Sequence, residues 1–189
     1  MTKQNRKHFF SLCAVCLTAF ISLIVIAPSL NAAEKGTGLE ETTLLSTGSD
    51  APSFSLKTLD NKPYTLSDHM GKKPVLLFFW SFFCGPCREE MPVLNEIFTS
   101  FGKEKLEFVG VNLDGKGLSK AIKRYLEESK FQFTAVFDEL KGFEYLVADP
   151  YGITGTPTVY IVDTKGKIAF SAVGKIEPAE LKKVIERSM

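Results

Sequence analysis

The sequence predicts an α/β domain with a mixed central sheet, helices on its faces and an added N-terminal β-hairpin. Three observations lead to this class. The run Val75–Trp80 is apolar at every position, which suits a central strand covered by helices on both faces. Segments with helical periodicity alternate with further strand-like runs along the chain. Two pairs of short strands are joined by turn residues.

Composition excludes several classes of protein. The chain has 189 residues, 44% hydrophobic and 24% charged, so it can bury the core of one ordinary domain. Its formal net charge of +1 falls to −2 without the first 33 residues, which carry three cations and no acid. Such a domain lacks the broad basic surface used to bind phosphate backbones, so we expect no nucleic-acid partner.

Residues 1–33 have the pattern of an export segment. A basic stretch, Lys3–His8, precedes 19 residues without charge, Phe9–Ala27. This run is long enough to cross a bilayer, so a removed signal peptide and a retained membrane anchor both stay open. Either one predicts a domain outside the cytoplasm, in the periplasm or on the outer face of the bacterial inner membrane. Cys13 and Cys16 lie inside the apolar run and are interpreted as filler.

A polar segment rich in Gly, Ser and Thr at residues 34–49 predicts a flexible linker, and the folded domain is expected at residues 50–189. The domain should begin with a hairpin of two short strands, Phe54–Leu56 and Tyr64–Leu66.

A helix is predicted to follow the central strand from Pro86. Its apolar stripe has helical spacing, and Pro92 is expected to kink it. The stripe consists of Leu94, Ile97, Phe98 and Phe101.

The rest of the domain continues the alternation. Strands are predicted at residues 106–113 and 133–137, with a helix at 117–129 between them. That helix is expected to turn Ala121, Ile122, Tyr125 and Leu126 inward. A hairpin of strands 158–162 and 167–173 and a helix from Pro178, with Leu181, Val184 and Ile185 inward, complete the domain.

The chemistry is expected in Cys84-Gly85-Pro86-Cys87, which holds the two cysteines that follow residue 33. The first thiol would lie at a helix N-terminus, where free N–H groups and the helix dipole stabilise a thiolate and lower its pKa. The second thiol, one turn further on, can attack a mixed disulfide on the first. Pro86 suits a first turn that needs no N–H donor, and Gly85 leaves room for an approaching partner.

A permanent disulfide is the simplest alternative in an exported protein. Closing a loop of two residues removes little chain entropy, however, so it would add little stability. A zinc site would need two further ligands, and the domain offers only His69. We therefore predict a redox-active dithiol without a metal or another cofactor.

Three separate segments, Ala51–Phe54, Phe79–Pro92 and Tyr151–Thr158, together resemble the thioredoxin superfamily, and most closely its exported TlpA/ResA-like thiol-disulfide oxidoreductases. The resemblance covers about residues 50–189 and implies a thioredoxin-like fold. It also implies that Cys84 is the nucleophile, that Cys87 resolves the mixed disulfide, and that Thr156-Pro157 is a cis peptide beside the dithiol.

Glu90 lies one helical turn after Cys87, on the same side of the helix. From the spacing alone it is either a proton acceptor for Cys87 or a solvated glutamate favoured by the helix dipole. The resemblance favours the proton acceptor. The buried aspartate of thioredoxin itself would fall at Phe78, so a proton relay of that kind is not expected.

Aromatic residues flank the dithiol. Trp80 is expected in the core. Phe82 and Phe83, at the end of the strand, are either an apolar rim for substrate docking or ordinary packing residues. The predicted substrate contacts are Phe83, Gly85, Pro86, Thr156 and Pro157.

The leading hypothesis is an exported monomeric enzyme that exchanges disulfides with protein substrates. The resemblance implies a reductant, acting on the oxidised CxxCH of apocytochrome c, with a membrane thiol carrier as electron donor. A disulfide oxidase or isomerase of the same fold stays open, because the surroundings of a dithiol tune its potential strongly. A Sco-like copper-binding module is the alternative from another class, although that group has CxxxC and a distal histidine.

Overall fold

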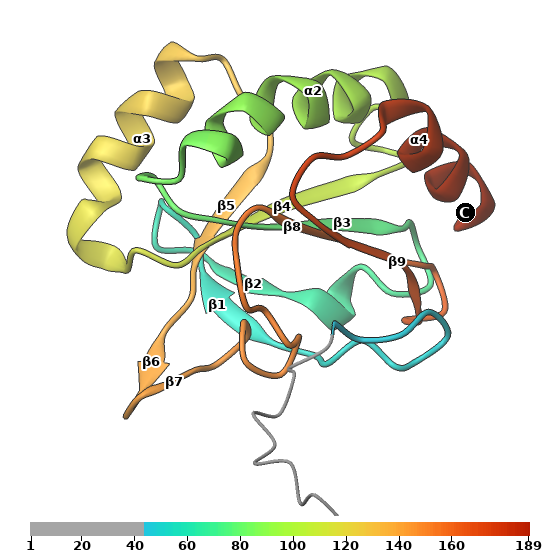
Figure 1. Cartoon of the computed structure of the whole chain (residues 1–189), viewed down its shortest axis with the longest axis horizontal. Coiled ribbons are helices and arrows are strands. Elements are labelled where there is room, and N and C mark those ends of the chain that lie inside the picture. The colour runs from blue at the N-terminus through green and yellow to red at the C-terminus, as the bar shows by residue number, and fades with distance from the viewer. Residues whose placement is uncertain (1–43) are drawn as a thin grey trace, which may run out of the picture. The chain divides into compact units, whose positions relative to one another are not determined.

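A five-stranded mixed sheet forms the centre of the domain (Figure 1). The structure is a computed structural model that describes residues 44–189, so the predicted export segment and most of the linker lie outside the described residues. The strand order is β5-β4-β3-β8-β9, with β3, β4 and β5 parallel and the other two antiparallel to their neighbours. These strands are β3 (Val75–Trp80), β4 (Glu107–Asn112), β5 (Thr134–Phe137), β8 (Thr158–Val162) and β9 (Ile168–Val173).

Three α-helices pack on one face of this sheet: α2 (Gly85–Phe101), α3 (Ser119–Glu128) and α4 (Pro178–Arg187). Their apolar stripes share one core with the alternate residues of β3 that point the same way, Leu76, Phe78 and Trp80. Helix α2 continues through Pro92 as one element. The predicted strands and helices of the α/β class are therefore present, with bounds that differ by at most two residues.

Within residues 44–189, no α-helix covers the opposite face. The predicted N-terminal hairpin is present as β1 (Ser55–Lys57) and β2 (Pro63–Thr65), followed by the short 3-10 helix η1 (Leu66–Asp68). They pack on a second core together with the loop around Tyr151. The expectation of helices on both faces of Val75–Trp80 is thus wrong for this face: a hairpin and a loop bury the strand equally well.

Two further details differ from the sequence prediction. Ala121 was expected to point inward but is exposed. The residues of α3 that are buried against the core are Ile122 and Leu126. A small hairpin, β6 (Leu140–Lys141) and β7 (Glu144–Tyr145), follows β5 and was not predicted. A second 3-10 helix, η2 (Lys116–Leu118), precedes α3. No helix within residues 44–189 has the length and apolar character needed to cross a bilayer.

The parallel strands bring three loops to one edge of the sheet. Cys84 follows β3, Asp114 follows β4 and Asp138 follows β5. Because the carboxyl ends of neighbouring parallel strands meet at the same edge, residues 24 to 54 positions apart in sequence are brought together there. This edge carries the candidate site.

Candidate active site

Cys84 is the N-cap residue of α2. Its backbone is extended, with φ −79° and ψ 105°, and its Sγ accepts a hydrogen bond of 3.1 Å from the backbone N–H of Cys87. A sulfur thus takes the place that a serine or aspartate oxygen usually has at a helix N-terminus. The same N–H group would stabilise a thiolate on Cys84 once the dithiol is reduced.

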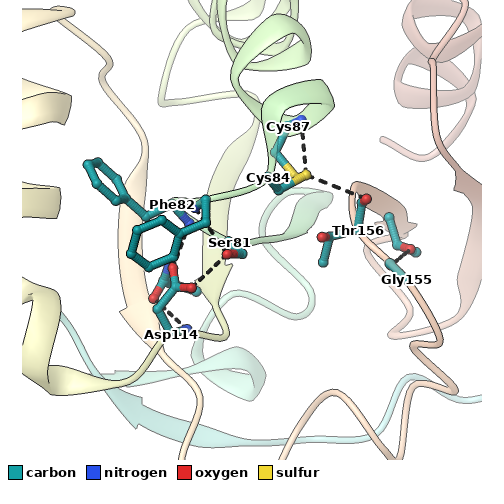
Figure 2. The surroundings of a disulfide bond; sticks show 10 residues. Ser81, Phe82, Cys84, Cys87, Asp114, Gly155 and Thr156 are labelled. Carbon is teal, nitrogen blue, oxygen red and sulfur yellow. Dashed lines mark hydrogen bonds between the residues drawn. A yellow bond between two sulfur atoms is a disulfide. The ribbon is translucent and has the colours of Figure 1, made fainter.

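The two cysteines differ in exposure. They form a disulfide in the structure, as Figure 2 shows. Cys84 is partly exposed, whereas Cys87 is 0% exposed and belongs to the core under α2. Cys84 is therefore the more accessible of the two sulfurs; the order of nucleophile and resolving cysteine stays a prediction, with which this exposure is compatible.

The loop before β8 lies beside the dithiol. The Thr156–Pro157 peptide bond is cis, as the resemblance implied. The carbonyl oxygen of Thr156 lies 3.5 Å from Sγ of Cys84, and Figure 2 shows the two facing each other. Gly155 accepts a hydrogen bond of 2.7 Å from the hydroxyl of Thr158, which holds this loop at the start of β8. The predicted contacts of Thr156 and Pro157 with a substrate are compatible with this position and stay a prediction.

Gly85 and Pro86 form the first turn of α2 in front of the sulfurs. Gly85 has open space where a side chain would project, and Pro86 is exposed. Gly85 therefore leaves room for a partner to approach Cys84, as the sequence predicted for this residue, and the predicted substrate contacts of Gly85 and Pro86 stay predictions.

Glu90 is buried rather than solvated. Its side chain is 7% exposed, and Oε2 accepts a hydrogen bond of 3.3 Å from the backbone N–H of Ile176. The geometry argues against the solvated alternative left open by the sequence. A carboxylate one turn from Cys87 with a single described hydrogen bond has acceptor capacity to spare, but its role as proton acceptor stays a prediction.

The aromatic residues around the dithiol divide into two groups. Trp80 and Phe78 are 0% exposed and belong to the core, as expected for Trp80. Phe83 is 73% exposed, next to Cys84. Phe82 packs edge-on against Tyr125 of α3, with ring centroids 5.7 Å apart. Of the proposed rim, Phe83 is free to contact a partner, whereas Phe82 mainly anchors the loop to α3.

Asp114 is the residue that sequence reasoning missed. In the structure the Asp114 carboxylate accepts hydrogen bonds from the Ser81 hydroxyl (2.6 Å) and the Phe82 N–H (2.5 Å), just before Cys84 (Figure 2). The only available signal was its place after a predicted strand parallel to the one before the dithiol.

His69 lies far from the dithiol. It stacks on Tyr64 with ring centroids 5.0 Å apart, and its Nδ1 is 3.6 Å from Glu107. Glu107 is paired with Val75, the first residue of β3, whereas Cys84 follows the last. Six residues of strand span about 17 Å, so His69 and Cys84 cannot share a metal ion, and the Sco-like alternative finds no histidine beside the dithiol within residues 44–189.

Comparisons with known proteins agree with this arrangement. The model of the AhpC/TSA family matches residues 47–171, which is most of the described domain. The chain belongs to the AhpC/TSA family. Within this family it is 31% identical to the thiol-disulfide oxidoreductase ResA of Geobacillus thermodenitrificans, over 77% of this chain and 80% of that protein. It is 35% identical to the thioredoxin-like protein YneN of Bacillus subtilis, over 81% and 83% of the two chains.

Solved structures show the same relationship for this AhpC/TSA domain. A protein described as thiol:disulfide interchange protein DsbE, from Chlorobium tepidum, matches with a TM-score of 0.61 and 33% identity, over 76% of this chain and 95% of that one. The thioredoxin domain of a thiol-disulfide oxidoreductase from Bacteroides vulgatus matches with a TM-score of 0.63 and 29% identity, over 76% and 97%. The chain is thus a thioredoxin-fold enzyme of the ResA and DsbE type, a thiol-disulfide oxidoreductase.

Proposed function

We propose that this enzyme reduces disulfides of protein substrates outside the cytoplasm through Cys84 and Cys87. The observation that carries the proposal is the pairing of an accessible Cys84 at the N-terminus of α2 with a fully buried Cys87 behind it. The kinship with proteins named thiol-disulfide oxidoreductase ResA supports it.

The reaction is a two-electron exchange. The Cys84 thiolate attacks one sulfur of the substrate disulfide, forming a mixed disulfide and releasing a substrate thiolate. The Cys87 thiol then loses its proton to Glu90 and attacks Sγ of Cys84, which closes the Cys84–Cys87 disulfide and releases the second substrate thiolate. The substrate gains two electrons, and the enzyme is returned to the dithiol by an external thiol donor.

The substrate and the donor are the finer part of the proposal. The resemblance to ResA-like proteins favours the oxidised CxxCH of apocytochrome c as substrate and a membrane thiol carrier as donor. The basic and apolar residues 1–33, as a removed signal or a retained anchor, would bring the domain to that compartment, with residues 34–49 as the linker.

The direction of the reaction is tested by the reduction potential of the Cys84–Cys87 pair, measured by equilibration with dithiothreitol or glutathione buffers. We expect a value close to that of thioredoxin, about −270 mV, and reduction of insulin disulfides that is lost in Cys84→Ala. A potential near that of the oxidant DsbA, about −120 mV, would overturn the assignment as a reductant and favour the oxidase.

A further inference from the structure

The loop Ser81–Phe83 connects the buried end of β3 to Cys84, and the backbone N–H groups of Phe82, Phe83 and Cys84 each have a hydrogen-bond partner. The Phe82 N–H donates to Asp114 and the Phe83 N–H to the Ser81 hydroxyl oxygen, at 2.5 and 3.2 Å. The Cys84 N–H donates to the carbonyl oxygen of Ser81 at 3.1 Å. Three successive backbone N–H groups, ending at that of Cys84, therefore hold the chain that leads to the nucleophilic cysteine.

Asp114 is itself held in place by hydrogen bonds to a residue of the sheet. Its Oδ2 accepts a second hydrogen bond, of 2.8 Å, from Nδ2 of Asn112, and its backbone N–H donates to Oδ1 of that residue at 3.0 Å. Asn112 is the last residue of β4 and is 0% exposed. The carboxylate thus ties the Ser81–Phe83 loop to the end of β4, the strand beside the central β3.

We propose that Asp114 is a positioning residue for the dithiol: through Ser81 and Phe82 it fixes where Cys84 Sγ lies relative to the first N–H groups of α2. Sγ must remain about 3 Å from the Cys87 N–H to benefit from that hydrogen bond, and hydrogen bonds to a charged sulfur weaken steeply with distance and angle. A loop released from Asp114 would let Cys84 move away from the helix N-terminus.

Replacing Asp114 has an effect through geometry and an effect through charge. The two can be told apart because they shift the titration midpoint of Cys84 in opposite directions. Removal of a negative charge near Cys84 would by itself favour its thiolate and lower the midpoint of its titration. Loss of the hydrogen bonds would raise that midpoint, because the thiolate would lose contact with the N–H groups. Asp114→Ala removes both the charge and the acceptors. Asp114→Asn removes the charge but keeps an oxygen for Phe82 and Asn112, and its amide can donate to the Ser81 hydroxyl.

The test is the pH dependence of alkylation of Cys84 in the fully reduced full-length chain, with iodoacetamide as the probe. Fragment-ion mass spectrometry separates Cys84 from Cys87 and from the N-terminal Cys13 and Cys16. We expect Asp114→Ala to raise the midpoint by about half a pH unit or more, which is about threefold less thiolate on the acid side of the titration. Ser81→Ala, which removes one of the three donors, should shift it in the same direction by less, and Asp114→Asn should not raise it.

Asp163→Ala is the matched control. Asp163 accepts the backbone N–H groups of Lys165 and Lys167, each at 2.8 Å, in the turn after β8 at the opposite edge of the sheet. This variant loses a carboxylate of the same kind and should leave the Cys84 profile unchanged.

The inference rests on the proposed role of Cys84 but fails separately from it, because alkylation needs no substrate. An unchanged or lowered midpoint in Asp114→Ala would overturn the positioning role while leaving the disulfide reduction intact. Should Asp114→Ala not fold, the same outcome in Ser81→Ala would overturn it. A wild-type Cys84 that titrates like an unperturbed thiol would instead contradict the proposed function.

Discussion

The backbone N–H of Cys87 donates to Sγ of Cys84 over 3.1 Å. The buried cysteine thus stabilises, through its own peptide group, the sulfur that its side chain later attacks. Because the two roles belong to one residue at the first turn of α2, the sequence Cys-Gly-Pro-Cys sets their geometry locally. The motif does not set the conformation of the loop Ser81–Phe83 before it or the surroundings of Glu90 after it. The first two predictions concern these two features.

Replacement of Glu90 tests the proton acceptor. Glu90→Gln keeps the shape and an oxygen for the Ile176 N–H, but an amide takes up no proton at neutral pH. We expect insulin reduction to slow by about tenfold or more, since general base catalysis commonly contributes 10²- to 10⁴-fold. The rate of Cys84 alkylation should not change, because only the attack by Cys87 is affected. Glu89→Gln, an exposed neighbour with the same change of charge, should retain the wild-type rate. Equal rates in Glu90→Gln and wild type would remove Glu90 from the mechanism.

Replacement of Phe83 tests the docking rim. Phe83→Ser should raise KM for a protein disulfide such as insulin by about threefold to tenfold, since an aromatic side chain at a contact is worth about 1 kcal/mol. The reaction with the small disulfide 5,5′-dithiobis(2-nitrobenzoate) should be unaffected. Phe143→Ser is the control, because Phe143 is also an exposed phenylalanine but lies on the β6–β7 hairpin. Equal losses with both disulfides, or equal effects of the two variants, would speak against a docking role for Phe83.

The buried carboxyl of Asp138 should make the free energy of unfolding of the protein depend on pH. Burial raises the pKa of this carboxyl above 3.8, although the N–H groups of Ala148, Glu139 and Val147 donate to it and act in the opposite direction. The folded chain therefore holds this proton more tightly than the unfolded chain. The contribution of the group to the free energy of unfolding is fully present below 3.8 and is lost as the pH rises through the raised pKa.

Asp138→Asn lacks this titration. Urea unfolding at several pH values between about 3 and about 7 should show the wild type losing stability relative to the variant as the pH rises. A difference between the two proteins that stays constant, or that grows in favour of the wild type, would show that burial does not dominate at Asp138.

The core around Gly110 leaves little room for a side chain at this position. A Cβ added there would lie 2.6 Å from Cε2 of Phe133 and 3.0 Å from Nε1 of Trp80. We expect Gly110→Ala to lower the free energy of unfolding by about 1–3 kcal/mol, as overpacking of a core usually does. Gly117→Ala, where no atom lies within 4 Å, should stay within about 0.5 kcal/mol of wild type in the same urea titration. Similar stabilities of the two variants would mean that the core around Trp80 adapts easily.

The sequence predicted those parts of the fold that depend on local patterns. The apolar run Val75–Trp80, the stripe of α2 and the turn residues of the two large hairpins each give a signal within a few residues. The β6–β7 hairpin gives none, because its strands have two residues each. It is held instead by the carboxylate of Asp138, which binds N–H groups on both sides of it.

The site shows the same division. Cys84 and Cys87 follow from their spacing and from the strand before them. The burial of Glu90 depends on Ile176, 86 residues away, and the contact of Asp114 with Ser81 depends on how two strands pair. The covering of one sheet face by a hairpin and a loop likewise depends on tertiary packing. An apolar strand indicates that it is buried, but it does not indicate which element covers it.

The central claim is that Cys84 takes the substrate and Cys87 releases it, and trapping of the intermediate tests it most directly. Reduced Cys87→Ser is mixed with oxidised insulin, and the product is mapped by non-reducing electrophoresis and peptide mass spectrometry. The account predicts a stable mixed disulfide between insulin and Cys84 that dithiothreitol reverses, and no adduct on Cys87 in Cys84→Ser, because Cys87 is buried. Peptide mapping separates both sites from Cys13 and Cys16. An adduct on Cys87 in Cys84→Ser, with none on Cys84 in Cys87→Ser, would contradict it.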